Sequence, residues 1–425
     1  MKIINVIGAG LAGSEAANYL ANHGFKVNLF EMRPSDKAPA HHTSNCAELV
    51  CSNSLKSSSK ENAAGVLKYE MEVLDSLVME SAKINQVPAG QALAVDRELF
   101  SKYIDEKIRN NKNINFINEE FSTFKDDEIY IVASGPLTSD SLSNELAKIF
   151  NKQHLYFYDA AAPLVLKNSI DFSKAYYKSR YDKGDSKDYI NCPFTEEEFN
   201  NFYFELIKGE RVKLKNFEKE IHFEGCMPIE SIATRGPKTL LFGPMKPVGL
   251  NNGSNPKAVV QLRCDNKMAD VYNIVGFQTN LLFKEQERIF RMIPGLENAQ
   301  FVKFGVMHRN TYINAPEIIN NFLQVKNHKN IFICGQLCGV EGYIESAMTG
   351  IIAAINASLY SQNKDLIEIP TNTVIGSLLM YISTAKSLQP MNANYGVVLS
   401  DTSDKLKFYE NSIASLKEWK KKVCL

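Results

Sequence analysis

Two cysteines stand in segments whose composition could support covalent chemistry. Cys51 lies in a polar run at residues 41–55, and Cys226 lies in the run Phe223-Glu224-Gly225-Cys226-Met227-Pro228, where glycine and proline favour a turn. A thiolate is accessible near neutral pH and can attack an electron-poor carbon. Local sequence alone still favours the ordinary role of a cysteine, a small buried apolar residue.

Two basic segments are candidate substrate contacts. Lys246 lies in the run 243–250, whose glycines and prolines fix the backbone, and His308 and Arg309 lie in the run 305–311. A rigid turn and a surface cluster are the alternative interpretations of these two segments.

The elements that must position these side chains begin near the N-terminus. An apolar strand at residues 2–7 is followed by a turn, a helix over 14–22, and a second strand over 26–30 that ends at Glu31. The turn is Gly8-Ala9-Gly10-Leu11-Ala12-Gly13, in which the three glycines permit a tight bend, backbone approach to a pyrophosphate, and close helix packing. Glu31 stands where an acid binds ribose hydroxyls, which favours FAD or NAD over NADP. This order predicts a dinucleotide site.

A second glycine-rich turn favours a flavin as the dinucleotide. The strand at residues 330–336 ends at Gly335, and the run 339–347, with Gly342 and Tyr343, leads into a helix. A late strand and turn of this kind can direct a helix N-terminus at a flavin ring. An ordinary strand-to-helix connection is the alternative.

The histidine pair His41-His42 raises the possibility of a metal site. Adjacent histidines cannot readily both bind one ion, and no carboxylate stands at a metal-ligand spacing. We therefore expect no metal, and expect this loop to contact the flavin.

Bulk properties set limits on the class of protein. The chain has 425 residues, 44% hydrophobic composition and a formal net charge of +0, which predicts two domains and no global attraction to nucleic acid. Eight cysteines without a C-x-x-C pair argue against disulfides and structural zinc. We expect no signal peptide, no membrane span and a cytoplasmic location. A basic tail at 416–422 is either a solvated helix end or an RNA contact.

The amino-acid composition changes between residues 166 and 299, which are rich in Tyr, Phe, Lys and Glu. We predict a discontinuous cofactor domain, 1–165 with 300–425, and an insertion domain at 166–299. The predicted fold class is α/β, with a Rossmann-type FAD-binding domain and an inserted α+β domain.

Over nearly its full length the chain resembles the TrmFO family, the GidA-like flavoproteins that methylate uracil in tRNA. The resemblance is carried by the runs 6–17, 31–34, 47–54, 87–90, 92–97, 223–230, 242–250, 259–263, 276–279, 305–310 and 339–346. It implies FAD as cofactor, 5,10-methylenetetrahydrofolate as carbon donor, NAD(P)H as electron source, and 5-methyluridine in the T-loop of tRNA as product.

The resemblance also implies roles for single residues. Cys226 resembles the nucleophile that adds to carbon 6 of uracil, and Cys51 resembles a flavin-side general base. The cofactor contacts it favours are Gly8, Ala9, Gly10, Leu11, Ala12, Gly13, Glu31, Arg33, Gly335, Gly342 and Tyr343. Because the target uridine must leave its stack, Tyr343, Lys246, His308 and Arg309 are candidate RNA contacts.

Five positions depart from the family pattern: Cys46, Lys257, Cys264, Asn280 and Cys338. These departures do not change the predicted chemistry, but they leave more than one RNA as the possible substrate. The alternatives are the same reaction on large-subunit ribosomal RNA, and a flavin-containing RNA-binding paralogue without activity. The presence of both Cys51 and Cys226 argues against the paralogue. The sequence does not set the oligomeric state, for which a monomer or a weak dimer is the expectation.

Overall fold

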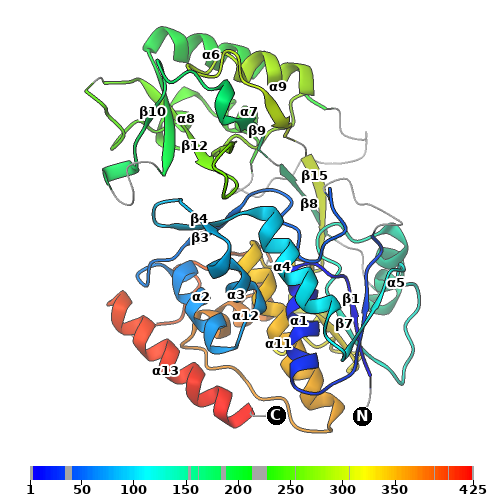
Figure 1. Cartoon of the computed structure of the whole chain (residues 1–425). Helices are drawn as coiled ribbons and strands as arrows, with labels where there is room; N and C mark the ends of the chain where they lie inside the picture. The colour runs from blue at the N-terminus through cyan, green and yellow to red at the C-terminus, as the bar shows by residue number, and fades with distance from the viewer. Residues whose placement is uncertain are drawn as a thin grey trace.

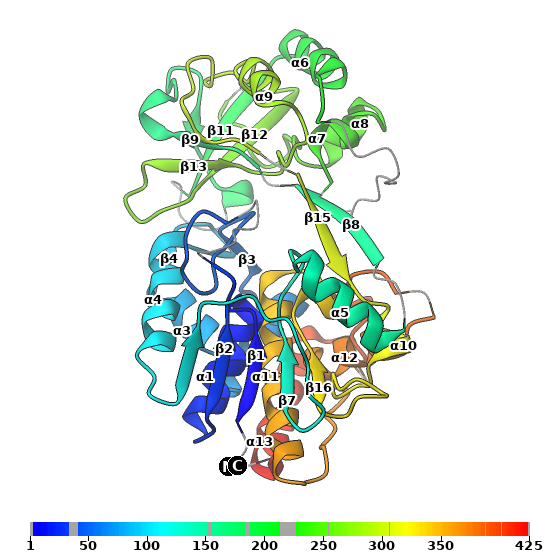
Figure 2. The same cartoon turned by 90° about the vertical axis from the view of Figure 1, so that its right-hand side faces the viewer.

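A five-stranded parallel sheet forms the centre of the larger part of the molecule (Figures 1 and 2). The computed structural model describes residues 3–33, 41–151, 155–160, 162–182, 188–212, 227–253, 255–305, 307–386, 388–400 and 402–423. The strand order is β16-β7-β1-β2-β6. The strands are β1 (Ile4–Ile7), β2 (Val27–Phe30), β6 (Ile114–Ile117), β7 (Ile129–Val132) and β16 (Ile331–Ile333).

β1 is the topological switch point of this sheet: β2 and β6 lie on one side of it, and β7 and β16 lie on the other. It pairs in parallel with β2 and with β7. In open α/β sheets, ligands bind beyond the carboxyl ends of the strands at such a switch point. The apolar strands β1, β7 and β16 are buried on both faces, as expected for a parallel sheet covered by helices, whereas β2 and the edge strand β6 are buried only in part.

Two helices that are far apart in sequence pack side by side against this sheet. They are α1 (Leu11–Asn22) and α11 (Tyr343–Ser361). A Cβ added at Gly350 of α11 would lie 2.1 Å from the carbonyl oxygen of Ala12, so only glycine permits this approach. The first turn of α1 is therefore fixed against α11 about two turns after the start of α11.

Further helices enclose the core of this part. They are α2 (Ala63–Val73), α3 (Leu77–Ile84), α4 (Arg97–Arg109), α5 (Asp140–Phe150), α10 (Ala315–Ile318), α12 (Val374–Thr384) and α13 (Lys405–Val423). A small antiparallel sheet of β3 (Ser54–Ser57), β5 (Ala92–Val95) and β4 (Gln86–Val87) lies at the end that faces the smaller part (Figure 1).

The smaller part is an antiparallel insert with its own hydrophobic core. Its sheet has the order β10-β11-β12-β13-β9-β14. The strands are β9 (Leu164–Leu166), β10 (Tyr176–Tyr177), β11 (Tyr189–Phe194), β12 (Ala258–Cys264), β13 (Val271–Ile274) and β14 (Phe301–Lys303). The helices α6 (Glu196–Lys208), α7 (Ile229–Ala233), α8 (Pro237–Phe242) and α9 (Phe283–Phe290) belong to the same part.

Two antiparallel strands connect the parts, β8 (Leu155–Ala160) and β15 (Met307–Tyr312) (Figure 2). The α/β fold with an antiparallel insert confirms the predicted fold class. The predicted boundaries near residues 165 and 300 remain a prediction.

Candidate functional site

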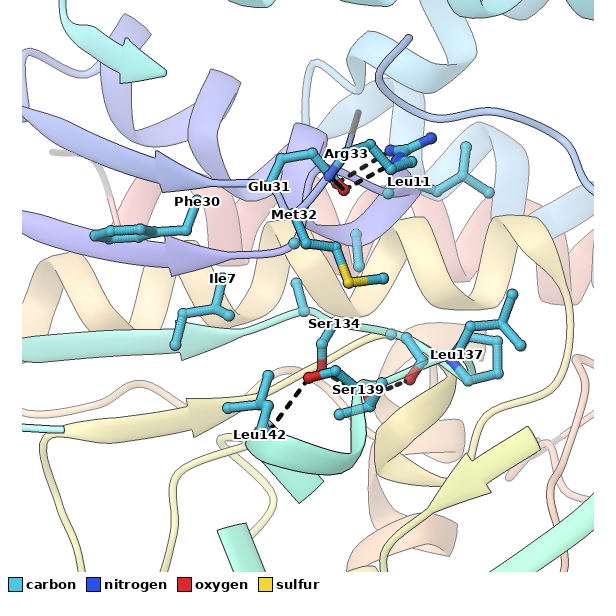
Figure 3. Close-up of a pocket in the computed structure, with 18 of the residues that line it drawn as sticks. Ile7, Leu11, Phe30, Glu31, Met32, Arg33, Ser134, Leu137, Ser139 and Leu142 are labelled. Atoms are coloured by element: carbon cyan, nitrogen blue, oxygen red, sulfur yellow. Dashed lines mark hydrogen bonds and ion pairs between the residues drawn. The ribbon is translucent and has the colours of Figure 1, made fainter. Parts of the chain in front are cut away.

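The main cavity of the larger part opens at the carboxyl ends of the central strands (Figure 3). The empty space between its walls measures about 1030 Å³ including the open mouth. Residues that follow four strands line it: Gly8 after β1, Glu31 after β2, Ala133 and Ser134 after β7, and Gly335 after β16. The cavity thus lies where the switch point at β1 predicts a ligand.

The first glycine turn forms one wall of the cavity, and glycine is needed at its three positions for different reasons. Gly8 has φ +96°, and a Cβ added to it would lie 2.7 Å from the Ala133 carbonyl oxygen. A Cβ added to Gly13 would lie 1.8 Å from the Gly8 carbonyl oxygen. At Gly10, which lines the cavity, an added Cβ would meet no protein atom within 4 Å. Gly8 and Gly13 are therefore needed by the fold, whereas Gly10 leaves space at the N-terminus of α1.

Glu31 and Arg33 form a buried ion pair on the same wall, visible in Figure 3. The Glu31 carboxylate accepts hydrogen bonds from the Ala9 N–H at 2.9 Å and from Arg33 Nε at 2.9 Å. Burial raises the pKa of Glu31, but the hydrogen bonds and charge of Arg33 outweigh burial and leave that pKa lowered. Arg33 Nη1 is buried without a hydrogen-bond partner. Both residues line the cavity, and Arg33 Nη1, 3.7 Å from Glu48 Oε2, is a buried donor that a polar group of a dinucleotide would satisfy.

The histidine loop reaches the cavity through one of its two histidines. His41 lines the cavity, and its Nδ1 is buried without a hydrogen-bond partner. Burial and the charge of Arg33 lower the pKa of His41 to about 4, so the ring is neutral at pH 7. The neighbouring Glu48 accepts from the backbone N–H groups of His42 and Thr43. Within the described residues, no group of three or more His, Cys, Asp or Glu side chains could hold a metal ion.

The opposite end of the cavity is formed by the start of α11. Gly335 and Tyr343 line the cavity, and Gly342 precedes the helix with φ +122°. The Tyr343 hydroxyl oxygen accepts from the backbone N–H of Cys51 at 2.8 Å and of Ser52 at 3.1 Å. Cys51 Sγ lies 3.0 Å from the same oxygen. Because both lone pairs are engaged, the hydroxyl hydrogen is directed at the sulfur. Burial raises the pKa of Tyr343 well above its usual value, which keeps that hydrogen in place.

Cations surround the Cys51 loop from two directions. Arg97 Nη1 donates to the Leu49 carbonyl at 3.3 Å, and Lys303 Nζ donates to the Val50 carbonyl at 3.4 Å. Arg97 is also paired with Asp265 of the insert at 2.8 Å. Burial and the nearby Arg97 charge lower the pKa of Lys303 to about 8. Positive charge near a thiol favours its thiolate form.

The insert contributes a third contact to this loop. Arg263 of β12 donates from Nε to Asn53 Oδ1 at 3.1 Å and from Nη2 to Ser52 Oγ at 3.0 Å. Asn53 in turn donates to the Cys264 carbonyl at 2.9 Å. Cys51 thus lies in a loop that is fixed by both parts of the molecule.

Several predicted site residues are placed elsewhere. Ala9 and Gly13 do not line the cavity, because Ala9 binds Glu31 and Gly13 packs on Gly8. Lys246 lies in a turn of the insert, where its carbonyl accepts from Arg180 at 2.9 Å. His308 and Arg309 lie in β15, but their side chains are outside the described part of the chain, and Cys226 is outside the described residues altogether.

The departures from the family pattern are largely internal. Cys46, Cys264, Asn280 and Cys338 are all buried, so these four side chains do not form an RNA-contacting surface. Lys257 is half-buried and paired with Glu196 of α6 at 2.6 Å. Among the helices of the described residues, none is long and apolar enough to span a membrane.

Comparison with known proteins agrees with this arrangement. The family model "Glucose inhibited division protein A" matches residues 3–365. The crystal structure titled "Structure of Aquifex aeolicus GidA in the form II crystal" has a TM-score of 0.74 at 17% identity, over 99% of this chain and 73% of that one. At that identity the likeness concerns the fold.

Closer relatives carry a common name, "Methylenetetrahydrofolate--tRNA-(uracil-5-)-methyltransferase TrmFO". The protein of Caldicellulosiruptor bescii is 55% identical over 96% of this chain and 94% of its own length. That of Desulforamulus reducens is 52% identical over 99% and 98%. The chain belongs to the TrmFO family, within the GidA family. The resemblance predicted from the sequence is thereby confirmed.

For this TrmFO family member, sequence reasoning missed the side chains that hold the Cys51 loop. Arg97 and Arg263 lie in runs that carry the family resemblance, but a single arginine on a helix or strand resembles a surface charge. The loop after β7, which carries Ser134 and Ser139 (Figure 3), was also missed as part of the cavity. The glycine and proline at its tip, Gly135 and Pro136, were the available signal that it lines the cavity.

Proposed function

We propose that this protein is a folate- and FAD-dependent methyltransferase that forms 5-methyluridine in the T-loop of tRNA. The observation that carries the proposal is the identity of 51–55% to proteins named for this activity, over at least 93% of the chain. A cavity beside a thiol supports it.

FAD would occupy the cavity, whose lining joins Gly10 and Glu31 to Gly335 and Tyr343. The open space at Gly10 and the N-terminus of α1 would hold the pyrophosphate, and Glu31 and Arg33 would bind polar groups of the adenosine half. Tyr343 and Gly342 at the N-terminus of α11 would lie at the flavin. When bound, the flavin and 5,10-methylenetetrahydrofolate supply the hydride and the one-carbon unit, with NAD(P)H as the proposed source of electrons.

Carbon 5 of uracil is a poor nucleophile, so the reaction needs covalent activation. We assign this step to Cys226: its thiolate adds to carbon 6, the electron pair moves onto the O4 enolate, and carbon 5 becomes nucleophilic. After carbon 5 has accepted the one-carbon unit, a base removes its proton and the thiolate leaves as the double bond re-forms. The bond from the transferred carbon to its carrier nitrogen would break, and a hydride would take its place to complete the methyl group. The thiol is thus regenerated in each turnover.

Cys51 is the proposed base. Its sulfur lies 3.0 Å from the Tyr343 hydroxyl oxygen, and Lys303 and Arg97 contact the preceding carbonyls. A hydrogen-bond donor and two nearby cations stabilise a thiolate, which is the form that accepts a proton.

The uridine must be extruded from its RNA to reach this site. Lys246, His308 and Arg309 remain the proposed basic contacts to RNA, and Tyr343 the proposed aromatic contact. The same chemistry on a uridine of large-subunit ribosomal RNA is the alternative target.

The activity is tested with purified, FAD-reconstituted protein, methylenetetrahydrofolate, a flavin reductant, and separate transcripts of tRNA and ribosomal RNA. We expect 5-methyluridine in tRNA by mass spectrometry. Product only in ribosomal RNA would favour the alternative target, and RNA binding without product would favour the inactive paralogue. Protein that shows no flavin absorbance after reconstitution would contradict the cofactor assignment.

The nucleophile has a separate test with RNA that contains 5-fluorouridine. Wild-type protein should form a covalent adduct that resists denaturing electrophoresis, and Cys226→Ala should form none. Cys264→Ala, which removes a buried thiol of the insert, is the matched control and should keep the adduct. An adduct in Cys226→Ala would overturn the assignment of Cys226.

A further inference from the structure

An exposed aromatic side chain at the edge of the insert has an unusual backbone conformation. Tyr181, which follows β10 in a short turn at Arg180–Asp182, has φ 58° and ψ 25°, and it is 53% exposed. The left-handed region costs an L residue about 1 kcal/mol or more, and aromatic residues rarely adopt it. Burial in the core does not explain this conformation, since half of the side chain faces solvent.

Gly249 supports the Tyr181 ring from one side. The Tyr181 N–H donates to the Gly249 carbonyl at 3.0 Å. A Cβ added to Gly249 would lie 2.6 Å and 2.7 Å from two carbons of the ring. Gly249 has φ +82°, so glycine is required there both by its own backbone and by the ring.

Arg180 fixes the two loops together. Its guanidinium donates to the carbonyls of Val248 at 2.5 Å and Lys246 at 2.9 Å, and to Gln261 Oε1 at 3.1 Å. These bonds hold the backbone on both sides of Tyr181 and Gly249. They also place a positive charge next to the exposed ring.

One face of β12 connects this ring to the thiol loop. Alternate residues of the strand belong to the core of the insert: Ala258, Val260, Leu262 and Cys264. Gln261 and Arg263 therefore lie on the opposite face, about 7 Å apart. Gln261 contacts Arg180, and Arg263 contacts Ser52 beside Cys51. The turn of Tyr181 and the loop of Cys51 are thus both bound to the same face of one strand.

We propose that Tyr181, supported by Gly249 and Arg180, is a stacking platform for an unpaired base of the RNA substrate, next to the uridine that is methylated. The proposal rests on the proposed function. Exposed aromatic rings with adjacent cations bind single-stranded bases by stacking, whatever the base. The bonds to Gly249 and from Arg180 hold the left-handed conformation before RNA binds, and this conformation leaves the ring exposed for stacking.

The folate co-substrate also has aromatic rings, but the position of Tyr181 favours RNA. A small co-substrate must lie against the flavin, and Tyr181 is not among the residues that line the cofactor cavity. An RNA chain extends beyond the reacting base and can cover the edge of the insert.

The test compares Tyr181→Gly, Tyr181→Phe and Gly249→Ala in full-length, FAD-loaded protein. For Tyr181→Gly we expect at least about a tenfold rise in both the Kd and the KM for tRNA, as stacking predicts, with kcat and the KM for methylenetetrahydrofolate unchanged. Tyr181→Phe should behave as wild type. Gly249→Ala should displace the ring and weaken binding in the same direction.

Two controls separate binding from folding. Glycine adopts the left-handed backbone conformation at position 181 without strain, so Tyr181→Gly should not lower the melting temperature. Phe204→Ala, which removes an aromatic ring of the insert with 57% exposure on α6, should leave tRNA binding unchanged.

The possible failures are distinct. Wild-type methylation with an unchanged tRNA Kd in Tyr181→Gly overturns the platform alone, and so does a change confined to the KM for methylenetetrahydrofolate. Wild-type protein that neither binds nor methylates RNA overturns the proposed function, and the platform with it.

Discussion

The two ends of the cofactor cavity are built in different ways. At the nucleotide end, Gly8, Gly10 and Gly13 come from one turn, and Glu31 follows the adjacent strand. At the thiol end, the loop of Cys51 is held by Tyr343, which lies 292 residues away in the sequence, and by Arg263 from the insert. One end is local in sequence, and the other is assembled from distant segments.

This difference separates binding from reactivity. The nucleotide end can form as soon as the first strand, turn and helix fold together. The thiol end exists only when the insert lies against the larger part, because Arg263, Asp265 and Lys303 all come from the insert. We therefore expect substitutions at the two ends to affect cofactor binding and methylation separately.

The largest effect should come from Gly13→Ala at the nucleotide end. The added Cβ would lie 1.8 Å from the Gly8 carbonyl oxygen, where neither backbone can move freely, and overpacking of this kind costs about 3 kcal/mol. We expect loss of bound FAD and a lower melting temperature. Gly10→Ala is the control: its Cβ enters open space, so the fold should survive while FAD binds more weakly. Equal melting temperatures for the two variants would contradict this account.

The thiol end is tested next by Arg263→Met. Removal of the guanidinium leaves Asn53 Oδ1 and Ser52 Oγ without these donors, at a cost of about 1–3 kcal/mol. We expect kcat for methylation to fall about tenfold or more, while FAD affinity measured by fluorescence titration stays unchanged. Arg291→Met, on the surface of the same insert, should alter neither quantity. A parallel loss of FAD would show that the two ends are not separate.

Lys303→Met should shift the pH dependence of methylation. The substitution removes a cation next to the Cys51 loop, which disfavours a thiolate there, so the pH of half-maximal rate should rise. Lys284→Met, which removes an exposed lysine of α9, serves as the control. An unchanged pH–rate profile would exclude Lys303 from the environment of the thiol.

Lys303 also predicts a trend in stability. Burial lowers its folded-state pKa from 10.5 to about 8. Between these pH values the unfolded chain binds more protons, so stability to urea should increase as pH rises through this interval. Lys303→Met should lack that increase.

The smallest effect is expected for Lys257→Tyr, which restores the residue common in the family. Lys257 pairs with an exposed carboxylate of α6, and exposed ion pairs contribute little to stability. Melting temperature, FAD affinity and methylation of tRNA should all stay at wild-type values. A change of RNA preference in this variant would instead link the departure to substrate choice.

The sequence predicted the strand, turn and helix of the nucleotide end because their determinants are neighbours along the chain. The spacing of Gly8, Gly10, Gly13 and Glu31 is sufficient to indicate strand, turn, helix and acid. The second glycine turn at Gly335 and Gly342 was also predicted, since strand and helix signals surround it.

The thiol end could not be predicted in the same way. No local pattern indicates that Arg263 reaches Asn53, or that the hydroxyl of Tyr343 meets Cys51, because these contacts depend on how α11 and the insert sheet are placed. Lys246 was selected for its rigid turn, yet the adjacent Gly249 gives that turn a second purpose in supporting Tyr181. Side-chain contacts between distant segments depend on three-dimensional packing, which the spacing of residues within one segment does not reveal.

The ribbon of β8 and β15 has a consequence for the engineering of this protein. The chain leaves the larger part and returns to it on paired strands, with Leu155 opposite Tyr312, and paired strands lie about 4.8 Å apart. A two-residue turn spans such a gap, so the segment between the two strands can be treated as one exchangeable cassette. Exchange of that cassette between relatives at these two strands would transplant one substrate preference onto another cofactor module.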